Sequence, residues 1–268
     1  MKKFWAKFRP KNKNPDGVMS IADHLRELRY RLIVSLVAVL VLAVVSAFFY
    51  NPLYQLLLHP YQQAVAVLAE VAPNLNPTPV IEGVTTPLTL AVKVCCVAGV
   101  VLASPVWLFQ LWRYIAPALM QNERKYALIF LGCGIPLFLA GVAVGYYVLP
   151  QAIWVLLSFT PQAIPVTNLL EINSFLSLVL QLMMVFGLGF VMPLVVVGLN
   201  FMGVVSAKTL GKARVYVVFG IFLFAAIATP STDPFSMLAL ALPMALLFLA
   251  AEVVARVHDK RKARAQAQ

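Results

Sequence analysis

The basic residues of this chain are confined to four short segments, which alternate along the sequence with polar segments that contain none. Twenty of the 21 Lys and Arg residues lie in Met1–Arg31, Arg113–Lys125, Lys208–Arg214 and Arg256–Arg264. No basic residue occurs in the polar segments on the other side of the apolar runs, Asn51–Pro87, Pro150–Glu171 and Thr229–Pro234. Because basic loops are retained on the cytoplasmic side of a membrane, this alternation predicts an even number of crossings, with both termini in the cytoplasm.

The composition excludes a water-soluble protein. Hydrophobic residues make up 62% of the 268 residues and charged residues 12%, and the mean hydropathy is +0.87. So few charges cannot cover a water-facing surface. The net charge of +11 would suit nucleic acid, but the basic residues lie at the edges of apolar runs. Anionic lipid headgroups are therefore the expected partner, and no nucleic acid is expected.

Six apolar runs are candidates for membrane-spanning helices, each of which needs about 20 residues to cross the hydrocarbon core. We predict spans at Leu32–Tyr50, Leu88–Leu111, Ala127–Leu149, Asn173–Asn200, Val215–Ala228 and Phe235–Ala251. Pro105 is expected to interrupt the second span and Pro150 to close the third. The last two runs are shorter than a normal core requires. Either these spans are short, or their helices extend beyond the apolar run.

The chain is thus expected to consist of a six-span membrane domain, 20–254, between two basic cytoplasmic tails. The first tail, 1–19, is polar and predicted to be disordered, and the second covers 255–268. Ser20 is a predicted N-cap, and the helical turns after it are expected to lie along the membrane surface before the first span begins. Within Asn51–Pro87, a segment with several prolines, we predict a short interfacial helix over Tyr61–Val71.

Nothing in the sequence supports catalysis, and we predict that the chain is not an enzyme. The three histidines, His24, His59 and His258, form no cluster, and no Ser, Cys or Lys has a general base close in sequence. No glycine-rich phosphate loop occurs. The three cysteines have the spacing of neither a disulfide framework nor a metal site. We interpret them as packing residues and expect no metal and no cofactor.

Two acidic residues stand among the basic ones. Glu27 has Asp23 and Arg31 four residues before and after it, so an intrahelical ion pair is the simplest interpretation. Glu123 precedes Arg124 and Lys125, and a solvated loop charge is the simplest interpretation there. Taken together, Glu27 and Glu123 are two carboxylates on one membrane face, and each is suited to binding a guanidinium group bidentately.

Two polar residues lie inside predicted spans. Lys93 is the one basic residue outside the four segments, and it is expected to extend toward the outer headgroups. Gln181 lies in the outer half of the fourth span, where a hydrogen bond to a neighbouring helix is the usual role.

Residues His24 to Leu32 resemble the H-L-x-E-L-R-x-R-L signature that precedes the first span of the TatC family, the twin-arginine translocase receptors. The match continues in order through Ala103–Val106, Gln110–Leu119, Asn122–Lys125, Phe186–Gly187, Pro193–Leu194, Arg214–Tyr216, Ala228–Pro230 with Asp233 and Ser236, and Leu240–Pro243. The resemblance covers about Ser20 to Glu252, and several separate motifs in one order make it specific.

The resemblance implies an all-α, concave bundle of six transmembrane helices in the cytoplasmic (inner) membrane. TatC proteins bind the paired arginines of signal peptides on folded passengers and recruit the single-span partners TatA and TatB, and the proton-motive force drives transport. We expect several copies of the chain in one complex. By motif position, Glu27 and Glu123 correspond to the family acids that hold the signal arginines. The other matched positions are Arg29, Arg31 and Tyr114 at the peptide site, Pro60 and Asp233 in outer segments, and Pro193 in the fourth span.

One position departs from the family. TatC proteins commonly have Glu two residues before the fourth-span proline, where this chain has Val191. We hypothesise that Gln181, on the same helix, supplies the in-membrane polar contact for a partner helix.

The main alternative function is a small-solute or ion secondary transporter. That class predicts an internal repeat and a charged residue near the bilayer midplane, and neither is evident in the sequence. An integral-membrane enzyme would need clustered nucleophile, base or metal ligands. A structural subunit of an unrelated complex would not account for the ordered motifs.

Overall fold

The computed structural model describes residues 21–71, 78–115, 123–158, 169–201, 203–229 and 234–266. Its helices are α2 Ile21–Ala47, α3 Tyr50–Val71, α4 Thr86–Leu102, α5 Ser104–Ile115, α6 Glu123–Ser158, α7 Ile172–Phe201, α8 Ala207–Ala228 and α9 Pro234–Gln266. Its strands are β1 Thr78–Val80 and β2 Leu169–Glu171, which pair in parallel. Within the described ranges the protein is therefore an all-α bundle with one short two-stranded ribbon.

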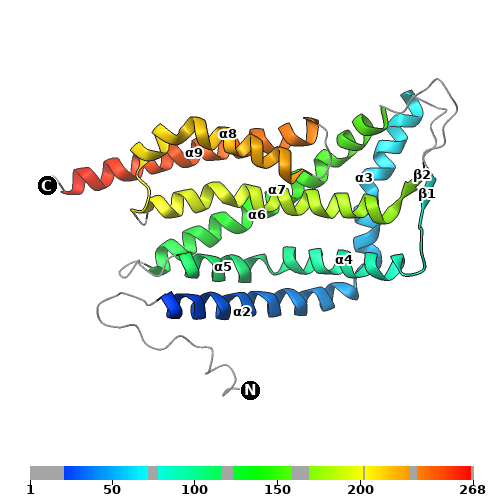
Figure 1. Ribbon diagram of the computed structural model, residues 1–268, viewed down its shortest axis with the longest axis horizontal. Coiled ribbons are helices and arrows are strands. Elements are labelled where there is room, and N and C mark those ends of the chain that lie inside the picture. The colour runs from blue at the N-terminus through cyan, green and yellow to red at the C-terminus, as the bar shows by residue number, and fades with distance from the viewer. Residues whose placement is uncertain are drawn as a thin grey trace, which may run out of the picture.

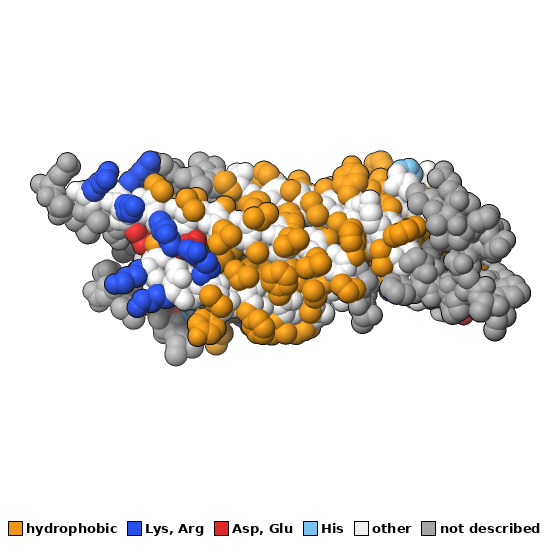
Figure 2. Space-filling view, turned by 90° about the horizontal axis from the view of Figure 1, so that it is seen from above, with side chains coloured by type: hydrophobic (Ala, Val, Ile, Leu, Met, Phe, Trp, Pro, Cys, Tyr) orange, Lys and Arg blue, Asp and Glu red, His pale blue; other side chains and the backbone are white. Residues whose placement is uncertain are grey.

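The helices lie along a common long axis, except that α3 crosses the bundle at one end, beside the β1–β2 ribbon (Figure 1). At the opposite end α2 begins, α9 ends, and the chain passes from α5 to α6 and from α7 to α8. We call this the basic end, because the described Lys and Arg residues other than Lys93 lie there, as Figure 2 shows for the face formed by α8 and α9. The described parts of the basic segments predicted to share one side of a membrane thus share one end of the molecule.

Five helical segments are long and apolar enough to cross a membrane: Ala22–Ala47, Phe130–Leu156, Ile172–Phe201, Ala207–Ala228 and Pro234–Arg261. The pair α4 and α5, bent by 59°, makes a sixth if it is counted as one span. The bend lies at the predicted interruption, because α4 ends at Leu102 and Pro105 lies in the first turn of α5. A proline is compatible with a first helical turn, where its missing N–H would have no partner. The six-span, all-α prediction is confirmed.

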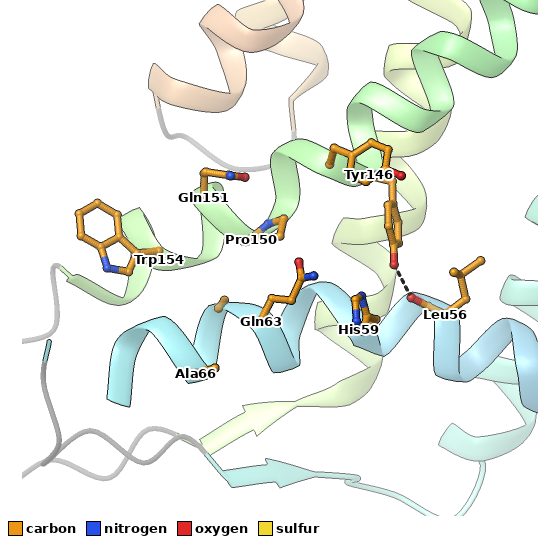
Figure 3. A pocket seen from close by; sticks show the side chains of 10 residues that line it. Leu56, His59, Gln63, Ala66, Tyr146, Pro150, Gln151 and Trp154 are labelled. Carbon is orange, nitrogen blue, oxygen red and sulfur yellow. Dashed lines mark hydrogen bonds between the residues drawn. The ribbon is translucent and has the colours of Figure 1, made fainter. Parts of the chain in front are cut away.

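Two helices continue past prolines that were expected to lie at or beyond their ends. The third span does not close at Pro150, since α6 continues to Ser158, and Pro60 lies inside α3 rather than in a loop. For Pro60 the reason is visible in Figure 3. A proline leaves the carbonyl four residues before it without its helical donor, and the Tyr146 hydroxyl on α6 donates to this carbonyl, that of Leu56, at 2.9 Å. The short interfacial helix predicted over Tyr61–Val71 is therefore the second half of a longer helix.

The bounds of α2, α8 and α9 test three further predictions about where the first and the last two spans begin and end. The turns after Ser20 do not form a separate surface segment, because α2 is continuous from Ile21 to Ala47 and no Gly or Pro interrupts it. The last two spans are not short, because α8 and α9 both extend beyond their apolar runs, which was one of the two alternatives. α9 reaches Gln266, through most of the predicted second tail. The first tail, 1–19, lies outside the described residues.

The tightest packing in the bundle joins α6 and α7. A Cβ added at Gly141 on α6 would lie 2.5 Å from the carbonyl oxygen of Phe186 on α7, so only glycine permits this approach. Most of the core joins α7 to α3, α4, α6 and α9, and α8 adds to it by packing on α9. A smaller buried cluster, which includes Leu108, Trp112, Phe138 and Val191, joins α5, α6 and α7. Because Val191 is enclosed there, the position where the family commonly has Glu is apolar inside this bundle.

Candidate functional site

One face of α2 carries His24, Glu27 and Arg31 at the basic end. These residues are three and four positions apart, so helical geometry brings them to the same side. Glu27 is only 5% exposed and Arg31 only 8%. The intrahelical pair expected from the sequence is present, and it is buried. A buried charge requires partners, because desolvation is costly.

The Arg31 guanidinium joins α2 to α5. Its Nε donates to Glu27 Oε1 at 3.1 Å and its Nη2 donates to the same oxygen, while Nη1 donates to Gln110 Oε1 at 3.3 Å. The other carboxylate oxygen of Glu27, Oε2, is buried and has no hydrogen-bond partner in the described part of the chain. Glu27 therefore holds one cation and keeps one acceptor open.

An aromatic contact lies next to this ion pair. The His24 ring on α2 stacks on the Tyr114 ring on α5, with centroids 4.7 Å apart and planes inclined by 20°. Gln110 and Tyr114 are one turn apart on α5, so α5 contacts α2 at two successive levels. We call His24, Glu27, Arg31, Gln110 and Tyr114 the α2–α5 site. Sequence reasoning did not single out His24 and Gln110 as site residues, although both lie in the matched motifs.

The second predicted acid begins another helix at the same end. Glu123 is the first residue of α6, where the helix dipole favours a negative charge. Its side chain lies outside the described part of the structure, as do residues 116–122. Arg29 is exposed on α2. The structure thus brings Arg31 to Glu27 and Tyr114 to His24 one turn before it, and places the Glu123 backbone at the same end of the bundle.

The remaining predicted residues lie elsewhere. Pro193 is buried inside α7, which continues past it to Phe201, and Pro60 is buried inside α3. Gln181 is exposed on α7, and Asp233 lies outside the described residues. None of these belongs to the α2–α5 site.

Lys93, expected to extend toward the outer headgroups, hydrogen-bonds to a neighbouring helix. Its Nζ donates to Asn173 Oδ1 at 3.0 Å and to Ser177 Oγ at 2.9 Å, both on α7. Asn173 and Ser177 are four residues apart and present their oxygens on one face of α7. Lys93 therefore links α4 to α7.

A second buried ion cluster, which sequence reasoning missed, lies between α8 and α9 at the basic end. The Glu252 carboxylate, 3% exposed, accepts from Arg214 Nε at 2.9 Å, from Arg214 Nη2 at 2.8 Å and from Arg256. Near it, Asp259 accepts from the Ala207 N–H at 2.8 Å and from Asn200 Nδ2 at 3.2 Å. The four-residue spacing of Glu252 and Arg256 was the available signal. The contacts with Arg214, Ala207 and Asn200 come from the fold.

A cavity of about 820 Å³ lies at the other end, between α3 and α6 (Figure 3). Its lining includes His59, Gln63, Gln151 and Trp154, and no carboxylate. Among the described residues no three His, Cys, Asp or Glu side chains are grouped closely enough to hold a metal ion. The described part of the chain thus offers buried carboxylates that bind cations, but no group of metal ligands.

Comparisons with known proteins agree with the motifs. The sequence model of the family described as "Sec-independent protein translocase protein (TatC)" matches residues 23–243. Among curated proteins, a TatC protein of Frankia casuarinae is 37% identical over 252 residues, covering 93% of this chain and 69% of the relative. The TatC protein of Escherichia coli (strain K12) is 35% identical over 234 residues, covering 87% of this chain and 86% of the relative.

The fold agrees as well. A crystal structure of the twin-arginine translocase receptor TatC superposes with a TM-score of 0.70 at 31% identity, covering 87% of this chain and 98% of that one. A second crystal structure of that receptor, in the detergent DDM, gives a TM-score of 0.71 at 32% identity, covering 87% of this chain and 99% of that one. Sequence motifs, family model, relatives and fold agree, and this multi-pass membrane protein belongs to the TatC family.

Proposed function

We propose that this chain is the twin-arginine signal-peptide receptor and core subunit of a translocase that exports folded proteins across the cytoplasmic membrane, driven by the proton-motive force. One observation supports this beyond family membership. Glu27 is a carboxylate buried at the basic end, with one oxygen that accepts no hydrogen bond from the described residues. A guanidinium group from a peptide would satisfy that oxygen.

The chemistry of two adjacent arginines explains why two acids are needed. Neighbouring side chains of an extended peptide point to opposite sides, so separated carboxylates fit them better than a single one. We assign one signal arginine to Glu27 and the other to Glu123. Arg31 holds Glu27 in place before the peptide arrives, and Tyr114 fixes α5 against α2 through His24. Arg29 is exposed on the same helix, where the peptide can reach it.

The arrangement in the membrane and the partners follow from the same proposal. The basic end faces the cytoplasm, with both termini there, since basic segments are retained on that side. The complex contains TatA-type and TatB-type single-span subunits and several copies of this chain, surrounded by anionic lipids. The 20–254 membrane domain carries these contacts between its two basic tails.

Photo-cross-linking from positions 27 and 123 tests the proposed receptor function. A probe at either position replaces that acid, and the other acid should still make it label a signal peptide with Arg-Arg about tenfold more strongly than the same peptide with Lys-Lys, because lysine lacks the bidentate fork. A probe at exposed Leu36, farther along α2 and away from both acids, should label either peptide only weakly. Equal labelling of both peptides from positions 27 and 123 would show that these acids do not read the arginines.

Gln181 is proposed as the polar contact for a partner helix, since it is exposed on α7. Gln181→Leu should lower cross-linking of a single-span partner to α7 about two- to fivefold, the effect of one interhelical hydrogen bond in a membrane. Leu188→Ala, two turns further along the same exposed face, should change it little. Unchanged export and cross-linking in Gln181→Leu would remove this residue from the partner contact.

A further inference from the structure

The seam between α8 and α9 contains a pocket at the basic end that none of the assignments above uses. It has a volume of about 470 Å³ and is lined by Ala207, Lys208, Gly211 and Lys212 of α8 and by Arg256, Asp259 and Lys260 of α9. The lining residues of α8 are one and four positions apart, and so are those of α9, so each helix presents one face to the pocket. Four of the seven lining residues are cationic.

The charges of this pocket are only partly compensated. Arg256 and Arg214 share the buried carboxylate of Glu252, and Asp259 accepts hydrogen bonds from the first N–H of α8 and the Asn200 amide. The exposed ammonium groups of Lys208, Lys212 and Lys260 have no ion-pair partner in the part of the chain that the structure describes. Three lysine ammonium groups thus lie around carboxylates that already accept hydrogen bonds from other residues. This arrangement attracts an anion with several acceptor oxygens.

Gly211 keeps this pocket open. A Cβ at this position would lie 3.2 Å from Arg256 Nη2 and 3.3 Å from Glu252 Oε1, so any larger residue would crowd the ion cluster from the pocket side. Gly211 therefore lets the Arg256 side chain lie close to the α8 backbone and leaves the space above it unfilled.

The surface next to the pocket is apolar. Val215 and Tyr216, one turn beyond Gly211 and Lys212 on α8, are 75% and 79% exposed, and Phe219 follows at 67%. Val253 of α9 is exposed one turn from Val257. Figure 2 shows the basic side chains directly beside an uninterrupted hydrophobic surface on this face. A ligand bound here meets cations at one end and a lipid-facing surface at the other.

We propose that the α8–α9 pocket binds the phosphate-bearing headgroup of an anionic phospholipid, whose acyl chains lie along Val215, Tyr216 and Phe219. The shared chemistry would also admit a free phosphate, but the adjoining apolar stripe favours a lipid. Lys208, Lys212 and Lys260 contact the phosphate oxygens, while Glu252 fixes the two arginines beneath. The bound lipid becomes part of the contact between α8 and α9 at the membrane boundary.

The test uses the full chain with Tyr216→Trp, in phosphatidylcholine nanodiscs that contain increasing amounts of brominated phosphatidylglycerol. Bromine quenches tryptophan only at short range, and the same protein without Tyr216→Trp gives the background. Brominated phosphatidylglycerol should quench the new tryptophan at much lower mole fraction than brominated phosphatidylcholine does. Lys208→Gln/Lys212→Gln should reduce the apparent affinity for phosphatidylglycerol about 10- to 30-fold. Equal quenching by both lipids in the Tyr216→Trp protein, without the lysine substitutions, would overturn the proposal.

A charge-matched control distinguishes the pocket from general attraction. Arg261→Gln/Arg264→Gln removes the same charge from exposed positions on α9 outside the pocket, and it should change the affinity no more than about twofold. An equal loss in both double variants would mean that no specific site exists. Millimolar inorganic phosphate should leave the quenching unchanged, and its reversal would assign the pocket to a soluble anion. Because Glu27 and Glu123 are untouched, signal-peptide affinity serves as the check that each variant is folded.

Discussion

Glu27→Gln should lower the affinity for a twin-arginine signal peptide about 10- to 100-fold, the effect of losing one charge-assisted contact. Glutamine keeps the size of the side chain but removes the negative charge that a guanidinium needs. Titration of a labelled peptide into the purified protein in detergent measures this loss directly. Asp23→Asn removes the same charge one turn earlier on α2, from a carboxylate that is 55% exposed and paired with Arg26 at the surface. That change should alter the affinity no more than about twofold.

A structural effect of Glu27→Gln has to be distinguished from a loss of recognition. Arg31 is 8% exposed and would lose its carboxylate, which for a buried pair lowers the free energy of unfolding by about 3 kcal/mol. Glu27→Gln/Arg31→Gln leaves neither charge unpaired and should recover most of that stability in a thermal denaturation assay, while the affinity stays low. Recovery of the affinity in this double variant would show that Glu27 supports the fold rather than binding the peptide.

The arrangement of spans and ends could be predicted because it depends on local composition. The alternation of basic segments places the described basic residues, other than Lys93, at one end, and the apolar runs give the helices that cross the membrane. Pro105 marked the bend between α4 and α5 because a missing N–H cannot be compensated locally within a continuous helix. These are properties of short stretches of sequence, so one chain is enough to read them.

Pro60 and Pro150 show where this local reasoning fails. The same missing N–H is tolerated at Pro60 because Tyr146, far away in the sequence, donates to the freed carbonyl of Leu56. The parallel pairing of β1 with β2 likewise joins two loops that are distant in sequence. Such compensation depends on tertiary contacts, which no local pattern reports.

The candidate site could be predicted only in part, because local spacing is visible in the sequence and tertiary contacts are not. The spacing of Glu27 and Arg31 predicted an ion pair. Only the packing of α5 on α2 shows that the pair is buried and that Arg31 also donates to Gln110. The Glu252 cluster was missed because a buried acid at the end of a span resembles a surface charge in the sequence. Glu123 was selected from its motif and its basic neighbours, and its role rests on the proposed function.

A crossed experiment should show which arginine each acid binds. Peptides with Arg-Arg, Arg-Lys, Lys-Arg and Lys-Lys are titrated against the parent protein, Glu27→Gln and Glu123→Gln. In the parent, each lysine should weaken binding by about tenfold, since an ammonium cannot replace the bidentate fork. In Glu27→Gln, one of the two single-lysine peptides should bind as well as Arg-Arg does, because the contact that it lacks is already gone. In Glu123→Gln, the other one should do so.

The double variant Glu27→Gln/Glu123→Gln should lose about 10²- to 10⁴-fold in affinity for the Arg-Arg peptide, the product of two separate contacts. It should also bind all four peptides alike, since neither position can then distinguish arginine from lysine. Two independent contacts add in free energy, whereas two acids that share one guanidinium do not. A double variant no weaker than Glu27→Gln alone would therefore mean that the acids act on a single arginine. The second arginine would then need another partner at the basic end.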